Sequence, residues 1–180
     1  HADQHSAQFV NGSSDRVMFS NDGGLYITQD ATSSLPDIRG ISDGYVSTQF
    51  YACAIHPEAG KDFFLAGAQD HGTNQLTSPG LGGAVEVVGG DGAFCHIGQN
   101  NGNFQVGASQ GGGFVATFGG DLSQGGFYFQ AGQAYFINPT ELDDINLYVY
   151  SSEENGHVLR TNLISSESVS VPISALGGQR

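Results

Sequence analysis

The sequence contains no tryptophan, only two cysteines and one methionine, and few charged residues. Lysine, arginine, aspartate and glutamate together make up 13% of the 180 residues. Long amphipathic helices need charged faces, and this chain has too few charges to supply them. What it has instead are short β-branched or aromatic runs interrupted by many of its 28 glycines, as in LGGAVEVVGGDGAF. These features predict an all-β fold.

Basic residues are the scarcest charged group, with five lysines and arginines against 18 acidic residues and a net charge of −13. The five cations are scattered, so no basic stripe can follow a phosphate backbone, and nucleic acid is excluded as an expected partner. No apolar run approaches the roughly 18 to 20 residues that a membrane-spanning helix needs. The chain begins at His1 without an initiator methionine or a charged-then-apolar leader, which is typical of a mature or internal segment. We expect a secreted protein, extracellular or at the cell surface.

A repeat runs through the chain. The segments QHSAQFV (4–10), QFYACAIHP (49–57) and DGAFCHIG (91–98) are short, mostly apolar strands that superimpose at intervals of about 40 to 45 residues. Each is followed by a polar loop, a second strand, a tight turn and a third strand. A weaker fourth copy begins at TELDD and has the same order. Four strands per unit at this period are typical of β-propeller blades.

We therefore predict a β-propeller of about four four-stranded blades, at residues 1–45, 46–90, 91–133 and 134–180. The alternative is an antiparallel sandwich whose glycine-rich turns align by chance. Four blades can close a small propeller, whereas larger propellers have six to eight. We favour a fragment of a larger propeller, completed by further blades or by a partner chain of the same assembly.

The strand order also predicts where polar side chains gather. Blade strands run up and down, so the turn between the second and third strands lies on the same face as the linker between blades. We call this face the rim; its predicted residues are Asp3, His5, Asp22, Asp70, His71 and Asp91. The rim is the predicted ligand-binding surface.

Three rim carboxylates, Asp22, Asp70 and Asp91, have more than one interpretation. An aspartate beside a glycine often stabilises a tight turn with its own side chain. The same carboxylates, converging from separate blades, could bind Ca²⁺. They are also the candidate catalytic residues, because two facing carboxylates can act as acid and base on a glycosidic bond.

The histidines and cysteines give weaker signals. No zinc motif is present, and His71 in a turn is a better ligand candidate than His96, which lies inside an apolar strand. Cys53 and Cys95 occupy the same position in the first strands of consecutive blades. They form either a disulfide, which would suit an exported protein, or a pair of buried free thiols.

Several motifs point to a family. DQHSAQFV, FSNDGGLYITQD, STQFYACAIHP, AGAQDHGTNQL and VVGGDGAF stand in this order over residues 3 to about 95. This series resembles the Asp-box-type propeller repeats of sortilin-like and xyloglucanase-like bacterial exoproteins. The resemblance implies a secreted propeller that binds protein or carbohydrate.

This chain also departs from the family pattern. An Asp box usually continues to a tryptophan, which in carbohydrate-binding relatives stacks on sugar rings, and here SNDGG is followed by none. The expected function is therefore an interaction module for protein or glycan. Calcium is the candidate cofactor. The alternative is a glycoside hydrolase of the xyloglucanase type that uses the rim carboxylates.

Overall fold

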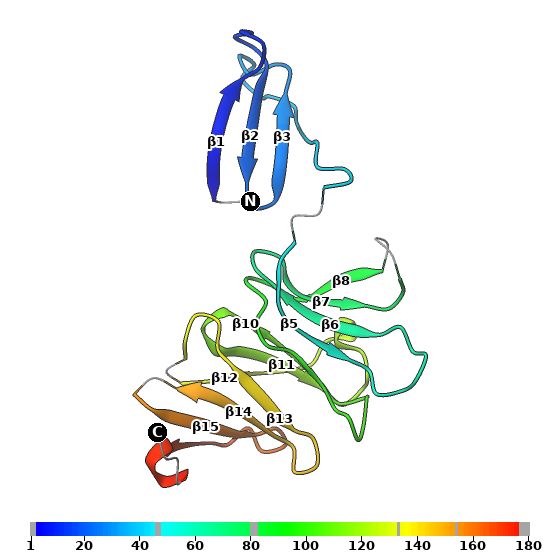
Figure 1. Ribbon diagram of the computed structural model, residues 1–180, viewed down its shortest axis with the longest axis vertical. Coiled ribbons are helices and arrows are strands. Elements are labelled where there is room, and N and C mark those ends of the chain that lie inside the picture. The colour runs from blue at the N-terminus through cyan, green and yellow to red at the C-terminus, as the bar shows by residue number, and fades with distance from the viewer. Residues whose placement is uncertain (1–2, 46–47, 80–82, 133, 154, 177–180) are drawn as a thin grey trace. The chain divides into compact units, whose positions relative to one another are not determined.

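The computed structural model describes residues 3–45, 48–79, 83–132, 134–153 and 155–176 (Figure 1). The chain divides into two compact units, His1–Thr48 and Gln49–Arg180, and each is described by itself. The strands form four antiparallel sheets of four strands, and in every sheet the strands are neighbours in sequence order. This architecture confirms the all-β prediction. We call the sheets blades 1 to 4.

Each blade lies inside one of the four predicted segments. Blade 1 contains β1 (Gln4–Phe9), β2 (Val17–Asn21), β3 (Gly24–Thr28) and β4 (Ile38–Gly40). Blade 2 contains β5 (Phe50–Ile55), β6 (Phe64–Ala68), β7 (Gly72–Leu76) and β8 (Ala84–Val88). Blade 3 contains β9 (His96–Ile97), β10 (Gln105–Ser109), β11 (Gly113–Thr117) and β12 (Phe127–Gln130). Blade 4 contains β13 (Thr140–Asp143), β14 (Tyr148–Glu153), β15 (His157–Asn162) and β16 (Ser168–Pro172).

Helical structure among the described residues is limited to short 3-10 segments at Gln110–Gly112, Leu122–Gln124 and Ile173–Leu176. None of the helices in the described part of the chain has the length and hydrophobicity needed to cross a membrane.

One strand differs from its prediction. The segment 91–98 was expected to be a strand throughout, yet β9 covers only His96 and Ile97. The preceding residues still pair with β10: Gly92 forms an isolated bridge with Ser109, and the Ala93 amide donates to the Ala108 carbonyl at 3.1 Å. Gly92 also lies against blade 2: its amide donates to the Ala68 carbonyl at 2.8 Å, and a Cβ there would lie 2.1 Å from the Gly72 carbonyl oxygen.

Blade 3 packs on both of its faces. Side chains alternate across a strand, so successive residues of β10 contact different neighbours. On one face Phe104, Val106 and Phe114 are at most 1% exposed and pack with Val149 and Leu159 of blade 4. The rings of Phe114 and Phe129 stack there with centroids 5.0 Å apart.

The other face of blade 3 packs against blade 2. Cys95, Ile97 and Leu122 form a buried cluster with Phe63 and Leu65. This interface also contains buried hydrogen bonds, which form only when blades 2 and 3 are accurately positioned. The buried Thr73 hydroxyl donates to the Ala108 carbonyl at 2.6 Å.

Buried Gln75 adds two more bonds across the interface between blades 2 and 3. It donates to the Asp121 carboxylate at 2.7 Å and accepts from the Leu122 amide at 3.0 Å. Because both bonds leave blade 2 for blade 3, they fix the register of the two sheets as well as their separation.

The backbones of blades 2 and 3 approach so closely that glycine is required at Gly67. A Cβ added there would lie 1.9 Å from the Ala93 carbonyl oxygen, which is backbone and cannot rotate away. The packing of the second unit therefore depends on this small residue.

We predict that Gly67→Ala lowers the free energy of unfolding by about 1 to 3 kcal/mol, because the added methyl must push the two blades apart. The matched control is Gly119→Ala, where a Cβ would meet its nearest neighbour, the Thr117 hydroxyl, at 3.4 Å. Urea denaturation of both variants measures the difference. Equal midpoints for Gly67→Ala and the original chain would contradict the packing described above.

Candidate functional site

Asp70 and Asp91 meet on the rim of the second unit. Asp70 lies in the turn between β6 and β7 with a positive φ of 58°, a conformation that aspartate tolerates better than most residues. Its amide donates to the Asp91 carboxylate at 2.9 Å. The Asp91 amide in turn donates to the Gln110 side chain at 2.8 Å. Asp91 thus links a turn of blade 2 to a turn of blade 3.

Tyr51 and His71 lie at the same rim. The Tyr51 hydroxyl donates to the Gln69 side chain at 3.0 Å, and His71 Nδ1 lies 3.0 Å from the Gln69 carbonyl. Desolvation raises the pKa of the Tyr51 hydroxyl, and the negative charges of Asp91 and Asp70 raise it further. Asp91 and Asp70 therefore act on Tyr51 electrostatically, in the same direction as its desolvation.

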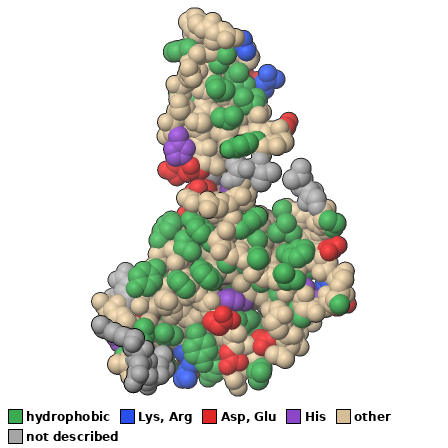
Figure 2. All heavy atoms as spheres, viewed as in Figure 1, with side chains coloured by type: hydrophobic (Ala, Val, Ile, Leu, Met, Phe, Trp, Pro, Cys, Tyr) green, Lys and Arg blue, Asp and Glu red, His purple; other side chains and the backbone are tan. Residues whose placement is uncertain are grey.

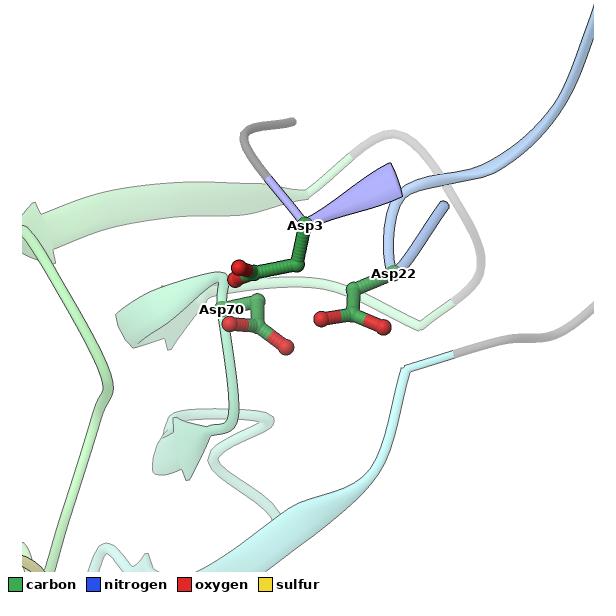
Figure 3. Close-up of side chains that lie close together, drawn as sticks. All are labelled: Asp3, Asp22 and Asp70. Carbon is green, nitrogen blue, oxygen red and sulfur yellow. The ribbon is translucent and has the colours of Figure 1, made fainter. Parts of the chain in front are cut away.

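In the first unit the structure brings together Asp3, His5 and Asp22. Figure 3 shows Asp3 at the residue before β1 and Asp22 in the turn between β2 and β3; their carboxylates have oxygens within 4.8 Å of one another. His5 Nε2 contacts the Asp22 carboxylate. Figure 3 also labels Asp70, which belongs to the β6–β7 turn of the second unit.

The first unit also contains a hollow of about 720 Å³ on the sheet of blade 1. Phe19, Tyr26 and Ile38 supply its apolar surface, and Gln4, His5 and Asn21 supply polar groups. Phe19 and Tyr26 are directly paired across β2 and β3, so both side chains project from the same face of the sheet. We call this feature the blade 1 hollow.

The proposed joint role of Asp22, Asp70 and Asp91 stays a prediction, both for calcium and for catalysis. Asp22 belongs to the first unit, and Asp70 and Asp91 belong to the second. Within the second unit the Asp91 carboxylate accepts a backbone hydrogen bond from Asp70, which joins two blades and is not the local turn contact considered above.

His96 is a packed residue, as its position inside an apolar strand suggested. Its Nε2 lies 2.8 Å from the Thr140 hydroxyl, which joins blade 3 to blade 4. Burial lowers the pKa of His96, and nearby Glu141 acts in the opposite direction.

In the structure Cys53 and Cys95 are free thiols and form no disulfide with each other. Ala54 of β5 packs against the cluster that contains Cys95, and Cys53, its neighbour in the strand, points to the opposite face. Burial raises the pKa of the Cys95 thiol to about 12. Both cysteines line one cavity of the second unit, where Cys53 is exposed and Cys95 is buried.

The blade 1 hollow and the buried Gln75 were not anticipated from the sequence. The signal for the hollow is the alternation in VMFSN and GLYIT, which puts Phe19 and Tyr26 on one face once the hairpin register is known. Gln75 has no such signal, because a glutamine in a short strand is ordinarily solvent-exposed.

Four four-stranded antiparallel sheets with this order define a β-propeller chain, and comparison with solved structures agrees. The chain is similar to an ancestral GH74 enzyme, with a TM-score of 0.54 and 12% identity over 98% of this chain and 26% of that one. It is also similar to apo AztD from Citrobacter koseri, with a TM-score of 0.53 and 11% identity over 94% of this chain and 47% of that one. At such low identity the likeness shows the fold alone.

The chain thus spans about a quarter and about half of these two proteins. No protein-family model and no curated protein sequence matches it.

Asp91→Ala should destabilise the second unit by about 1 kcal/mol, because the Asp70 amide loses its acceptor and the two turns lose their link. Asp62→Ala removes the same charge from an exposed loop and serves as the control. Thermal unfolding of the two variants separates the hydrogen bond from the change in net charge. If both variants melt alike, Asp91 does not hold the turns together.

The two thiols should differ sharply in reactivity. In the native protein at mildly alkaline pH, iodoacetamide should label exposed Cys53 and leave Cys95 unmodified, since Cys95 is 3% exposed and its thiol stays protonated. In denaturant both should react. Peptide mass spectrometry gives the result, and equal native labelling of the two cysteines would show that the cluster around Cys95 is open.

Proposed function

We propose that this chain is part of a secreted or cell-surface β-propeller of the Asp-box type that acts as an interaction module for protein or glycan. The observation that carries the proposal is the blade 1 hollow, which combines aromatic and polar side chains on an open sheet face. Ligand sites in proteins typically join such apolar surfaces with a few polar groups that fix the orientation of the ligand.

Comparison with blade 3 supports this role for the hollow. Aligned at their hairpins, Phe19 and Tyr26 of blade 1 correspond to Gly107 and Val115 of blade 3. At Gly107 the sheet is packed so tightly that an added Cβ would lie 2.9 Å from Val88 of blade 2. Blade 1 carries two large aromatic side chains where blade 3 needs small ones. Its face is shaped to receive a ligand or a partner, and aromatic rings are well suited to stack on sugars or to anchor a protein.

The hydrogen bonds of three carboxylates in the second unit favour a non-catalytic role there. A general acid of a glycosidase needs a raised carboxyl pKa. Hydrogen bonds instead lower the pKa of Asp121, through Ser123 and Gln75, and that of Asp144, through Asn100. The Asp91 carboxylate accepts the Asp70 amide. These carboxylates are engaged in holding turns and blades.

A glycoside hydrolase remains the second candidate, on one specific observation. Asp3 and Asp22 bring two carboxylates together beside His5 within the first unit, and one structural neighbour is described as a GH74 enzyme. Release of reducing sugar from xyloglucan oligosaccharides that stops in Asp22→Asn would support the hydrolase. Absence of release at high protein concentration would leave the binding role alone.

The binding role predicts that Tyr26→Ala abolishes most of the signal on a glycan array or in capture of a protein ligand, because one wall of the hollow is lost. Tyr135→Ala is the matched control, since Tyr135 is 49% exposed and lies outside the hollow. Both variants should keep the circular dichroism spectrum of the original chain. Equal binding by the two variants would show that the ligand does not bind in the blade 1 hollow.

A further inference from the structure

A second cavity lies in the second unit, where the innermost strands of three blades come together. It has a volume of about 390 Å³ and is lined from β5, from β9 with its flanking residues, and from β13 with its following turn. Figure 2 shows acidic side chains and a histidine among hydrophobic side chains on the visible face of this unit. The cavity uses none of the residues of the blade 1 hollow.

The walls of this cavity are held in place by hydrogen bonds between blades. Gln99 donates to the Ile55 carbonyl at 3.2 Å, which joins blade 3 to blade 2. The amide and side chain of Asn100 donate to the two Asp144 oxygens at 2.7 and 2.9 Å, which joins blade 3 to blade 4. A site whose walls are already fixed loses little entropy when a ligand binds.

The polar groups of the cavity favour a cation. Glu141 and Asp144 both line it, and no lysine or arginine does. Both Asp144 oxygens are engaged by Asn100, whereas the hydrogen bond that the exposed Glu141 carboxylate makes among the described residues is with the amide of the next residue, Leu142, at 3.2 Å. Glu141 is therefore the carboxylate available to a ligand. It also lies close enough to the His96 ring to act on it electrostatically.

A metal ion fits this cavity less well than an organic cation. Among the described residues, none of the cavity's histidine, cysteine, aspartate or glutamate side chains belongs to a group of three with ligand atoms close enough to share an ion. Beside the polar groups the cavity has an aliphatic surface from Ile55, Ile97 and Leu142. A ligand with one charged end and a short apolar body would match both parts.

We propose that this cavity binds a small primary amine, with its ammonium group at Glu141 and its alkyl chain against Ile55 and Leu142. The ammonium group donates a charge-assisted hydrogen bond to the Glu141 carboxylate. The site is distinct from the proposed binding face on blade 1, and the amine could bind whether or not that face has a ligand.

The test is isothermal titration calorimetry of the full chain with n-butylamine, compared with n-butanol as the uncharged match. Butylamine should bind and butanol should not. Glu141→Gln should weaken butylamine binding about tenfold or more, as expected for a lost charge-assisted hydrogen bond. Glu167→Gln removes the same charge outside the cavity and should leave the affinity unchanged.

A second variant tests the apolar part of the site. Ile55 is 57% exposed, so Ile55→Ala should fold normally. It should weaken butylamine binding several-fold and leave methylamine binding unchanged, because only the longer amine reaches the aliphatic surface. Three results would overturn the proposal: no heat with butylamine, equal losses in Glu141→Gln and Glu167→Gln, or butanol binding as tightly as butylamine.

Discussion

The packing of blade 3 between blades 2 and 4 is the constraint on which the second unit depends. A single four-stranded sheet has two faces, and one sheet alone cannot bury either. Blade 3 buries both, one through Phe104, Val106 and Phe114 against blade 4 and the other through Ile97 and Leu122 against blade 2. The two clusters stabilise three blades at once, because each is shared between neighbouring sheets.

The polar sites follow from this packing. Close approach of blades 2 and 3 brings the turn at Asp70 to the linker at Asp91, where the backbone needs acceptors and the carboxylate supplies one. Approach of the innermost strands brings His96 next to Thr140 and Glu141, which otherwise lie far apart in the sequence. The rim and the inner cavity therefore both result from the close packing of neighbouring blades. Blade 1, described as its own unit, carries the aromatic hollow on one face of its sheet.

The sequence was most informative where the repeat was most regular. The spacing of Phe9, Ile55 and Ile97 predicts the strand order of the blades, and in the structure each of these residues ends the first strand of its blade. The same reasoning groups Asp70 with Asp91. It left the cysteines open between a disulfide and free thiols, because equivalence in the repeat does not give the distance between two side chains; the structure has Cys53 exposed and Cys95 buried, both as free thiols.

Other features could not be predicted because they depend on neighbours distant in the sequence. Gln75 is buried only because Asp121 and Leu122 of the next blade bond to it. The first strand of blade 3 covers only two residues, and the Gly92 segment before it bonds to Ala68 of blade 2 as well as bridging to Ser109 of β10. The blade 1 hollow requires the exact hairpin register, which a shift of one residue would reverse.

Amide hydrogen exchange, followed strand by strand in the full chain, tests the central role of blade 3 most directly. If blade 3 holds the second unit together, the amides of β10 and β11 should be the slowest to exchange and should open only when the whole unit unfolds. The outermost strand β16, which pairs only with β15, should exchange much faster. Exchange of β10 and β11 at the rate of β16 would show that the blades open independently and would contradict the account.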